Sequence, residues 1–403
     1  MNRKQRQLAI EGGTPSRSVS IEPLYWVEQE TRARILHILD SGEFSQWYGG
    51  PATREFEARF ASLIGAANAI AVNSGTSALH AAVATLGLQP GDEVVIPAAC
   101  YVSAASVVVQ EGAIPVLCDI SEDTYVMSVD DLRRHVTDRT RAVIVVHFWG
   151  CPANMETIYE FAHDRNILVI EDCGQSHGST VNGRVTGSIG DFGCFSFAPR
   201  KHITTGQGGM VTSRKAEDGD KVRELVNKGK GQGWLAYNRL GFSYVMPDLD
   251  AVIGLDGLQN LSATIDQRRR AATIYRRVLA ETPLVLAEDP SWGTHVYFKM
   301  PILLPEGMAS VRDLFKKAVE AENISCRVPH PPAWTVPWLA EYVTRKNRPY
   351  DPELYPVTGQ LLPRMVEVET GPNMSEQDVE VSAQAVLDVW NYVNEKFGHL
   401  LKG

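Results

Sequence analysis

Long apolar runs are missing from this sequence of 403 residues. No stretch reaches the roughly 18 consecutive apolar residues that a membrane-spanning helix needs, and Met1 to Glu11 is polar, so we expect neither a membrane segment nor a signal peptide. Basic residues are outnumbered: the formal net charge is -9 at pH 7. This charge argues against nucleic acid or an anionic membrane as the main partner. We therefore expect a cytoplasmic protein.

Cysteine pairs and nucleotide-binding motifs are also missing. No Cys-x-x-Cys pair occurs, and no two histidines have the spacing of metal ligands. We expect buried free thiols, rather than disulfides or zinc ligands, at Cys100, Cys118, Cys151, Cys173, Cys194 and Cys326. No Gly-x-Gly-x-x-Gly or Gly-x-x-x-x-Gly-Lys-Ser/Thr pattern stands at a strand–helix junction, which disfavours dinucleotide or nucleoside triphosphate chemistry.

The sequence does contain a regular alternation of short apolar runs and amphipathic segments. It predicts strands at 68–72, 94–97, 114–119, 142–147 and 167–171. It predicts helices at 27–40, 53–64, from 74 onward, 103–110, 129–136 and 154–163. Repeated strand–helix–strand units at this spacing predict a mostly parallel α/β sheet with helices on both faces.

The rhythm changes after about residue 265. A helix at 265–279, a strand at 297–303 and a last helix behind the capping-box pattern Ser375-x-x-Asp378 predict a smaller α+β domain. We expect an N-terminal arm at 1–25, a large domain at 26–265 and a small C-terminal domain at 266–403. The basic runs 228–230 and 268–270 are interpreted as solvated faces.

One lysine stands in a setting that suits covalent chemistry. Lys201 lies on a short turn between two apolar strands, and small residues follow it as far as Gly209. A lysine that is desolvated near other positive charge loses its proton readily and forms imines with carbonyl compounds. Glycines after it let a flat ligand approach the backbone. Alone, Lys201 could equally be a surface lysine at a turn.

An acidic residue, Asp172, lies one strand and one turn before this lysine in the sequence. Asp172 ends a strand that is too apolar to be exposed, so its carboxylate needs a partner, and a protonated pyridinium nitrogen is a suitable one. A core arginine or a magnesium ion would serve as well. Glu171 points to the opposite face by strand alternation and is the weaker candidate. The pairing of Asp172 with Lys201 is the one that a pyridoxal phosphate enzyme needs.

A phosphate site is predicted at the helix start Asn73-Ser74-Gly75-Thr76-Ser77. Free backbone N–H groups, hydroxyls and the helix dipole would all favour an anion there, although serine and threonine cap many helices. In such sheets ligands bind beyond the carboxyl ends of the strands, so this segment can share one site with Asp172 and Lys201. His147 and His177 are interpreted as core or loop histidines. Trp47 and Tyr48 could line a pocket or pack on the next helix.

Taken together, these segments resemble the DegT/DnrJ/StrS family of sugar aminotransferases. The markers are 73–79, 91–94, 146–150, 170–178 and 196–209, and the resemblance covers about residues 25–390. It implies fold-type I, with a seven-stranded large-domain sheet, the cofactor pyridoxal 5'-phosphate (PLP, cycling with its amine form PMP), and a homodimer with shared active sites. The opening Gly12-Gly13-Thr14-Pro15 resembles the branch that aminates cyclitol ketones or makes 3-amino-5-hydroxybenzoate.

The resemblance also implies roles for single residues. Lys201 would be the Schiff-base lysine, and Asp172 would be the partner of the pyridine nitrogen. The other residues implied in cofactor binding are Gln175 against the ring, Gly75, Thr76 and Ser196 on the phosphate, and Tyr101 as a nearby aromatic.

Two departures from the family pattern stand out. Where the family has an asparagine that reaches the phosphate across the dimer interface, this chain has Ser243, with a shorter reach. The nearby family arginine is Val245, which carries no charge, and the usual Gly-Glu-Gly-Gly contains Gln207 here.

We therefore expect an aminotransferase that moves an amino group from glutamate or glutamine to a ketone on a sugar nucleotide or cyclitol, in secondary-metabolite biosynthesis. One alternative is a dehydratase of the same family, in which histidine replaces the lysine; His202 follows Lys201 directly. A 3-amino-5-hydroxybenzoate synthase-like enzyme and a non-catalytic family member are the others.

Overall fold

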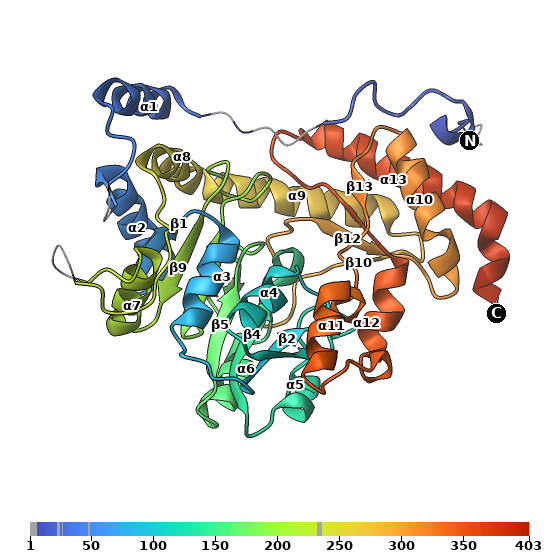
Figure 1. Ribbon diagram of the computed structural model, residues 1–403. Helices are drawn as coiled ribbons and strands as arrows, with labels where there is room; N and C mark the ends of the chain where they lie inside the picture. Colours follow the sequence, from blue (N-terminus) through green and yellow to red (C-terminus); the bar gives the residue numbers. More distant parts are fainter. Residues whose placement is uncertain (1–5, 22–24, 26, 47–48, 232–235, 403) are drawn as a thin grey trace.

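The computed structural model describes residues 6–21, 25, 27–46, 49–231 and 236–402 (Figure 1). Trp47 and Tyr48, proposed above as pocket or packing residues, lie outside the described residues. Among the described residues, no helix is both long enough and apolar enough to cross a membrane.

The centre of the molecule is a sheet of seven strands in the order β1-β9-β8-β5-β4-β2-β3. The strands are β1 (Asn68–Val72), β2 (Glu93–Pro97), β3 (Ile114–Cys118), β4 (Thr140–Val146), β5 (Leu168–Asp172), β8 (Phe192–Ser196) and β9 (Gly209–Ser213). Of these seven strands, β9 runs antiparallel to its neighbours β1 and β8, and the connection from β8 contains no helix that could form a crossover. The predicted mostly parallel α/β fold is confirmed.

Helices cover both faces of this sheet, as the sequence predicts (Figure 1). They are α2 (Pro51–Ile64), α3 (Gly75–Ala84), α4 (Ser103–Gln110), α5 (Val129–His135), α6 (Met155–His163) and α7 (Ala216–Val226). Outside this layer, α1 (Gln29–Ser41) packs on α8 (Asp248–Gln259), which in turn packs on α2. Along β1 the side chains alternate between two buried clusters: Ile70 packs into one and Ala71 into the other. Each face of the sheet is therefore a core of its own.

The C-terminal part contains a separate antiparallel sheet in the order β10-β12-β14-β13. Its strands are β10 (Val285–Leu286), β12 (Met300–Leu303), β13 (Cys326–Arg327) and β14 (Met365–Val368). The helices of this part are α9 (Leu261–Leu279), α10 (Arg312–Ala321), α11 (Pro337–Arg345), α12 (Pro356–Leu361) and α13 (Glu376–Phe397). Three two-residue strands, β6 (Thr180–Val181), β7 (Arg184–Val185) and β11 (Gly293–Thr294), form a third sheet.

Local sequence signals agree with the helix starts. The Ser128 hydroxyl accepts a hydrogen bond from the Asp131 N–H at the start of α5, and Ser375 with Asp378 forms the predicted capping box of α13. The strand predicted at 297–303 is shorter, since only Met300–Leu303 pairs with β14. All six cysteines are buried and free, as expected.

The N-terminal arm folds onto the C-terminal part, with a single 3-10 turn at Ala9–Glu11 (Figure 1). Its anchor is Glu322, which directly follows α10 and is fully buried. The Glu322 carboxylate accepts hydrogen bonds from the Ala9 N–H at 2.8 Å, the Ser16 N–H at 2.7 Å and the Arg6 guanidinium at 2.6 Å. The arm is thus held by one buried charge, with the more exposed ion pairs of Glu11 with Lys396 and of Arg6 with Asp388 beside it.

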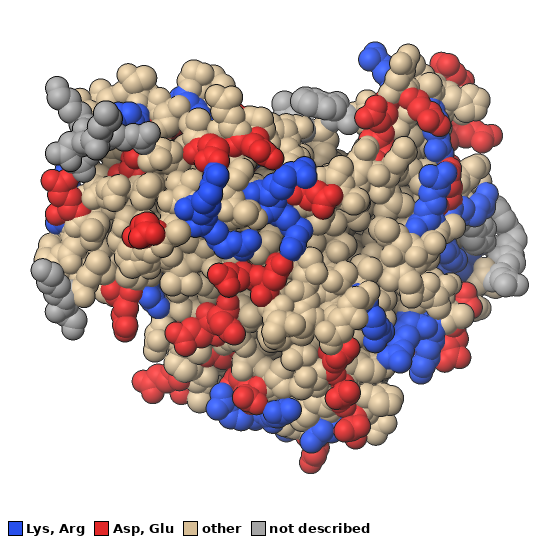
Figure 2. All heavy atoms as spheres, turned by 180° about the vertical axis from the view of Figure 1, so that it is seen from behind, with Lys and Arg blue, Asp and Glu red and all other residues tan. Residues whose placement is uncertain are grey.

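The solvated-face interpretation of the two basic runs is partly wrong. Arg268 is 1% exposed and Lys230 is 6% exposed, because α9 turns Arg268 toward the Arg200 carbonyl and Lys230 lies in a bridge with Tyr237. Arg270 and Lys228 are exposed, as expected. On the face shown in Figure 2, acidic and basic side chains are interspersed.

Candidate active site

A cavity of about 510 Å³ lies at the carboxyl ends of the central strands and is closed by residues of the C-terminal part. The central part of the chain contributes Gly75, Thr76, Tyr101, Asp172, Gln175, Ser196 and Lys201 to its lining. The C-terminal part contributes Phe298, Lys299, Arg327, His330 and Glu367. The structure therefore brings together seven of the eight site residues that the sequence indicates.

Lys201 enters the cavity from the turn of residues 197–208, hereafter the lysine turn, between β8 and β9. The residue before it, Arg200, has a φ of 75°, which is uncommon for a side chain of this size. The Lys201 amine lies 4.6 Å from the centre of the Phe298 ring. Burial lowers the pKa of Lys201 to about 8, with help from the charges of Lys299 and Arg268 and against that of Asp172. Near neutral pH the amine loses its proton far more easily than an ordinary lysine does.

Asp172 stands at the end of β5, and burial raises the pKa of its carboxyl, while the Gly174 N–H, Lys201 and His147 oppose that rise. Its Oδ1 accepts a hydrogen bond from the Gly174 N–H at 3.0 Å, and its Oδ2 has no hydrogen bond to any described residue. A Cβ on Gly174 would lie 3.1 Å from Asp172 Oδ1 and 4.0 Å from Lys201 Nζ. The carboxylate and the amine therefore border one small space of the cavity, and a basic ring nitrogen placed there would have an anionic partner.

The predicted phosphate site is formed by the start of α3 and the end of β8. The Ser74 hydroxyl caps α3, and the Thr76 hydroxyl lies 2.8 Å from that of Ser103. A Cβ on Gly75 would come within 2.6 Å of the Ser196 Cβ, so only glycine lets these two elements approach so closely. The first N–H groups of a helix have no partner within it. These donors and hydroxyls suit a phosphate.

Three further candidates differ in their position. The Gln175 side-chain oxygen accepts a hydrogen bond from the Trp149 N–H at 2.7 Å, which fixes the amide against the cavity. Tyr101 is 48% exposed and meets the His330 ring edge-on at 5.0 Å. Ser243 is exposed and does not line the cavity of its own chain. Its contact with a cofactor from the partner subunit stays a prediction.

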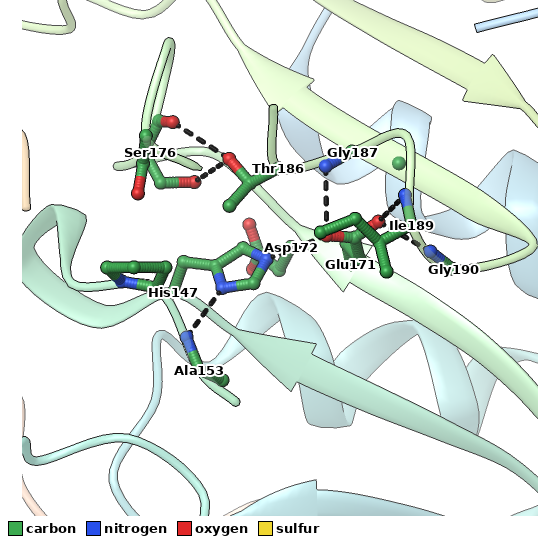
Figure 3. A network of polar contacts seen from close by, with 12 residues as sticks. His147, Ala153, Glu171, Asp172, Ser176, Thr186, Gly187, Ile189 and Gly190 are labelled. Carbon is green, nitrogen blue, oxygen red and sulfur yellow. Dashed lines mark hydrogen bonds and ion pairs between the residues drawn. The ribbon is translucent and has the colours of Figure 1, made fainter. Parts of the chain in front are cut away.

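Behind the cavity, Glu171 and His147 form a buried polar network (Figure 3). The Glu171 carboxylate accepts hydrogen bonds from the backbone N–H groups of Gly187, Ile189 and Gly190 at 2.7–2.9 Å. His147 Nδ1 accepts from the Ala153 N–H at 3.1 Å, so its Nε2 carries the proton and donates to Glu171 at 3.1 Å. Glu171 points away from the cavity, as strand alternation predicts.

Two further histidines near the cavity, His177 and His202, are buried core residues. His177 packs against Phe195 and Phe197, and burial lowers its pKa to about 3. The His202 ring is 1% exposed, and its Nε2 lies 3.3 Å from the Val296 carbonyl oxygen. Of the adjacent pair Lys201 and His202, it is Lys201 that lines the cavity.

No pattern in the sequence marks the C-terminal wall. Its strands are two to four residues long, so no period of apolar residues points to Arg327 or Glu367. Lys299 pairs with Glu369, and the Glu367 carboxylate accepts a hydrogen bond from the Trp149 indole N–H at 2.6 Å. Burial raises the pKa of Glu367.

Two curated proteins are similar to this chain over most of its length. The first is GDP-perosamine synthase of Vibrio cholerae, 31% identical over 356 residues, which are 88% of this chain and 95% of that protein. The second is UDP-N-acetyl-3-dehydro-alpha-D-glucosamine 3-aminotransferase of Acidithiobacillus ferrooxidans, 38% identical over 308 residues, 76% of this chain and 80% of that protein.

Solved structures share the fold. The putative sugar aminotransferase Spr1654 of Streptococcus pneumoniae in its PLP form superposes with a TM-score of 0.84 over 93% of this chain and 99% of that one, at 23% identity. This likeness confirms the predicted fold-type I architecture. A model of the DegT/DnrJ/EryC1/StrS aminotransferase family matches residues 26–387, and the chain belongs to that family.

Proposed function

We propose that this protein is a PLP-dependent aminotransferase that moves an amino group from glutamate or glutamine to a ketone carbon of a nucleotide-linked sugar. The observation that carries the proposal is the placement of Lys201 and Asp172 on two sides of one small space in the cavity. The family supports the cofactor and the reaction class.

The residues that line the cavity suit the parts of PLP one by one. Gly75, Thr76 and Ser196 would hold the phosphate, with Ser243 of the partner subunit added in a homodimer. Asp172 would hold the proton of the ring nitrogen through its free Oδ2, and Gln175 would lie against the ring. Tyr101 would close the site beside them. Bound PLP supplies an aldehyde carbon that exchanges the amino group and a ring that withdraws electrons from it.

Lys201 is the proposed catalytic base and acid. Its amine would hold the aldehyde carbon covalently in the resting enzyme. Once released, Nζ would take the proton from the α carbon of the amino donor, and in the second half-reaction it would return a proton to the carbon of the former ketone. A pKa of about 8 suits both duties. Near that pH the amine is present both in its neutral form, which acts as the base, and in its protonated form, which acts as the acid. The Phe298 ring lies 4.6 Å from this amine and covers one side of it.

The relatives support a nucleotide-linked keto sugar as the acceptor, because one is named for a GDP-linked sugar and the other for a UDP-linked one. A keto-cyclitol and a 3-amino-5-hydroxybenzoate-type acceptor remain the alternatives, and we place the reaction in aminosugar-containing secondary metabolism. A cytoplasmic homodimer and the division at residues 25 and 265 belong to the same proposal.

Dehydration by the same family is the second candidate. It uses a histidine where an aminotransferase has lysine. The position of Lys201 in the cavity, with His202 turned to the Val296 carbonyl, favours amination. A product that has lost water rather than gained an amine would favour dehydration over amination.

The test combines a spectrum, a covalent trap and a substrate panel. Purified protein should show the near-visible absorption of a protonated imine, and borohydride reduction should fix a PLP-sized mass on the peptide that contains Lys201. Lys201→Ala should lose both, together with ~10³-fold or more of the turnover with 3-keto and 4-keto GDP- and UDP-sugars. Lys317→Ala, at an exposed lysine of α10, should keep them. A band that survives in Lys201→Ala contradicts the proposal.

A further inference from the structure

The C-terminal wall of the cavity has one acidic side chain among its described residues, and half of that carboxyl group is unused. The wall consists of Phe298, Lys299, Arg327, His330 and Glu367. Glu367 Oε2 accepts a hydrogen bond from the Trp149 indole N–H at 2.6 Å. Its Oε1 has no hydrogen bond to any described residue. One carboxyl oxygen is therefore left for a ligand in the cavity.

Trp149 connects this carboxyl group to the opposite wall. Its main-chain N–H donates to the Gln175 side-chain oxygen at 2.7 Å, while its indole N–H holds Glu367. Trp149 is 2% exposed and has a φ of 53°, a costly value for a residue with a side chain, which persists only where the surroundings enforce it. Glu367 is thus held in a defined position relative to Gln175, the residue proposed to lie against the cofactor ring.

The same wall brings Glu367 close to the reactive amine. The Trp149 carbonyl accepts a hydrogen bond from the Phe298 N–H at 2.8 Å, and the Phe298 ring lies 4.6 Å from Lys201 Nζ. The charge of Glu367 acts directly on the pKa of Lys201, where it opposes the effect of burial. A molecule held by Glu367 in this cavity therefore has its neighbouring atoms near the Lys201 amine.

The charges around Glu367 decide which group its free oxygen can hold. Burial raises the pKa of this carboxyl, and the cations Lys299 and Arg327 oppose that rise. At Oε1 the ionised acid would repel a phosphate or a carboxylate, and the two cations would repel an ammonium group. A hydroxyl is neutral and both donates and accepts, so it suits the carboxyl in either protonation state. Of the substrates proposed above, the sugar carries hydroxyls, whereas glutamate and glutamine carry none.

We propose that Glu367 binds a hydroxyl of the acceptor sugar next to its ketone, and that Trp149 positions Glu367 for this task. The inference rests on the proposed function and names a residue that selects one of its two substrates. Glu367 is then a specificity-determining residue. Trp149, which does not line the cavity, is a positioning residue. A sugar without this hydroxyl, or with the opposite configuration at that carbon, should be a poorer acceptor.

The test measures sugar binding separately from turnover, on the purified protein with PLP added. Isothermal titration calorimetry compares UDP with UDP-glucose and GDP with GDP-mannose. These two sugars have hydroxyls but no ketone, so they bind without reacting, and the ratio of dissociation constants within each pair isolates the contribution of the sugar. The variants are Glu367→Ala, Glu367→Gln, Trp149→Phe and the control Glu306→Ala, at an exposed glutamate that follows β12.

In the wild type, the sugar should tighten binding about 3- to 30-fold relative to the nucleotide alone. Glu367→Ala should remove this gain, and Glu367→Gln and Trp149→Phe should remove part of it. Glu306→Ala should keep the gain, and binding of UDP and GDP should be the same in every variant. Glu367→Gln still offers the Trp149 indole an acceptor, so it decides the comparison if Glu367→Ala does not fold.

A second readout uses the acceptor that the wild type aminates and an analogue without the hydroxyl next to the ketone. The wild type should prefer the hydroxyl compound in kcat/KM, whereas Glu367→Ala should treat both alike. In Trp149→Phe the KM for the acceptor should rise while the KM for glutamate stays unchanged.

The same sugar gain in the wild type and in the Glu367 variants, or no gain with either sugar in the wild type, overturns the inference. A wild type that aminates no keto sugar counts against the proposed function, and the binding comparison still decides the role of Glu367.

Discussion

Arg268 of α9 is a buried cation that contacts the backbone of the lysine turn. Its guanidinium donates to the Phe298 carbonyl at 2.8 Å and to the Arg200 carbonyl at 3.3 Å, and among the described residues it forms no ion pair. Its charge is one of the causes that lower the pKa of Lys201. Arg268 therefore both holds the backbone beside the lysine and favours its neutral amine.

Removing this charge should make Lys201 harder to deprotonate. In apo-protein, the rate of PLP capture should rise with pH through a midpoint near 8 in the wild type. Because a cation that repels the protonated amine is gone, Arg268→Met should move the midpoint upward and slow capture at pH 7.5 by roughly threefold to tenfold. Stopped-flow absorbance measures this rate.

Arg268→Lys keeps the charge and is the control, so its midpoint should stay close to that of the wild type. A downward shift in Arg268→Met, or equal shifts in the two variants, would mean that Arg268 acts only through packing.

Among single residues, the sequence identifies those that lie in recognisable motifs and misses those of the C-terminal wall of the cavity. Lys201, Asp172 and Gly75 stand in patterns that carry their own chemistry, so they could be singled out before the fold was known. Arg268 sits in a run of three arginines on a helix, and only the packing of α9 distinguishes the buried one from Arg270. Glu367 of the C-terminal wall is held by Trp149, a contact between residues 218 positions apart that no local pattern could indicate.

The strand β5 carries one acid to each side, and each does a different task. Asp172 lies in the cavity, whereas Glu171 ties the loop 187–190 and His147 to the strand (Figure 3). With four donors on one buried carboxylate, the end of β5 has little freedom to move. The position of Asp172 thus depends on its neighbour in the chain.

Glu171→Gln should lower the free energy of unfolding by about 1–3 kcal/mol, since the new NH₂ group faces backbone donors that lose their acceptor. Urea unfolding followed by fluorescence measures the change. Glu288→Gln, at an exposed glutamate, should leave the midpoint within error. Unchanged stability in Glu171→Gln would show that the network contributes no net stability.

Element types and order followed from sequence because the period of apolar residues differs between strand and helix. The helix predicted at 103–110 agrees with α4, and the Ser128 cap agrees with the start of α5. The short strands β6, β7 and β11 have two residues each and no period at all, so only their partners define them.

For the molecule as a whole, the N-terminal arm depends on Glu322. Burial alone would raise the pKa of this carboxyl, but hydrogen bonds from Ala9, Arg6 and Ser16 lower it overall. Because the folded arm lowers the pKa of Glu322, the carboxylate stabilises the folded arm at pH values above 4.5, the usual pKa of this group. This stabilisation is lost as the pH falls through the lower pKa of the folded state. The arm should therefore loosen in acid.

Glu322→Gln should loosen the arm at neutral pH as well, because the amide supplies one acceptor where the carboxylate serves several donors. Trypsin cleavage after Arg17 should become about 5- to 50-fold faster. Glu320→Gln, two residues earlier at an exposed glutamate paired with Lys316, should not change the rate. Equal cleavage in both variants would show that other contacts hold the arm.

The two walls of the cavity belong to sheets that share no strand in the described part of the chain. A substitution on β13 leaves the main-chain pairing of the central sheet unchanged, and with it the strand ends that carry Asp172 and the lysine turn. Such a division lets the substrate preference change on one wall while the reactive residues on the other wall are kept.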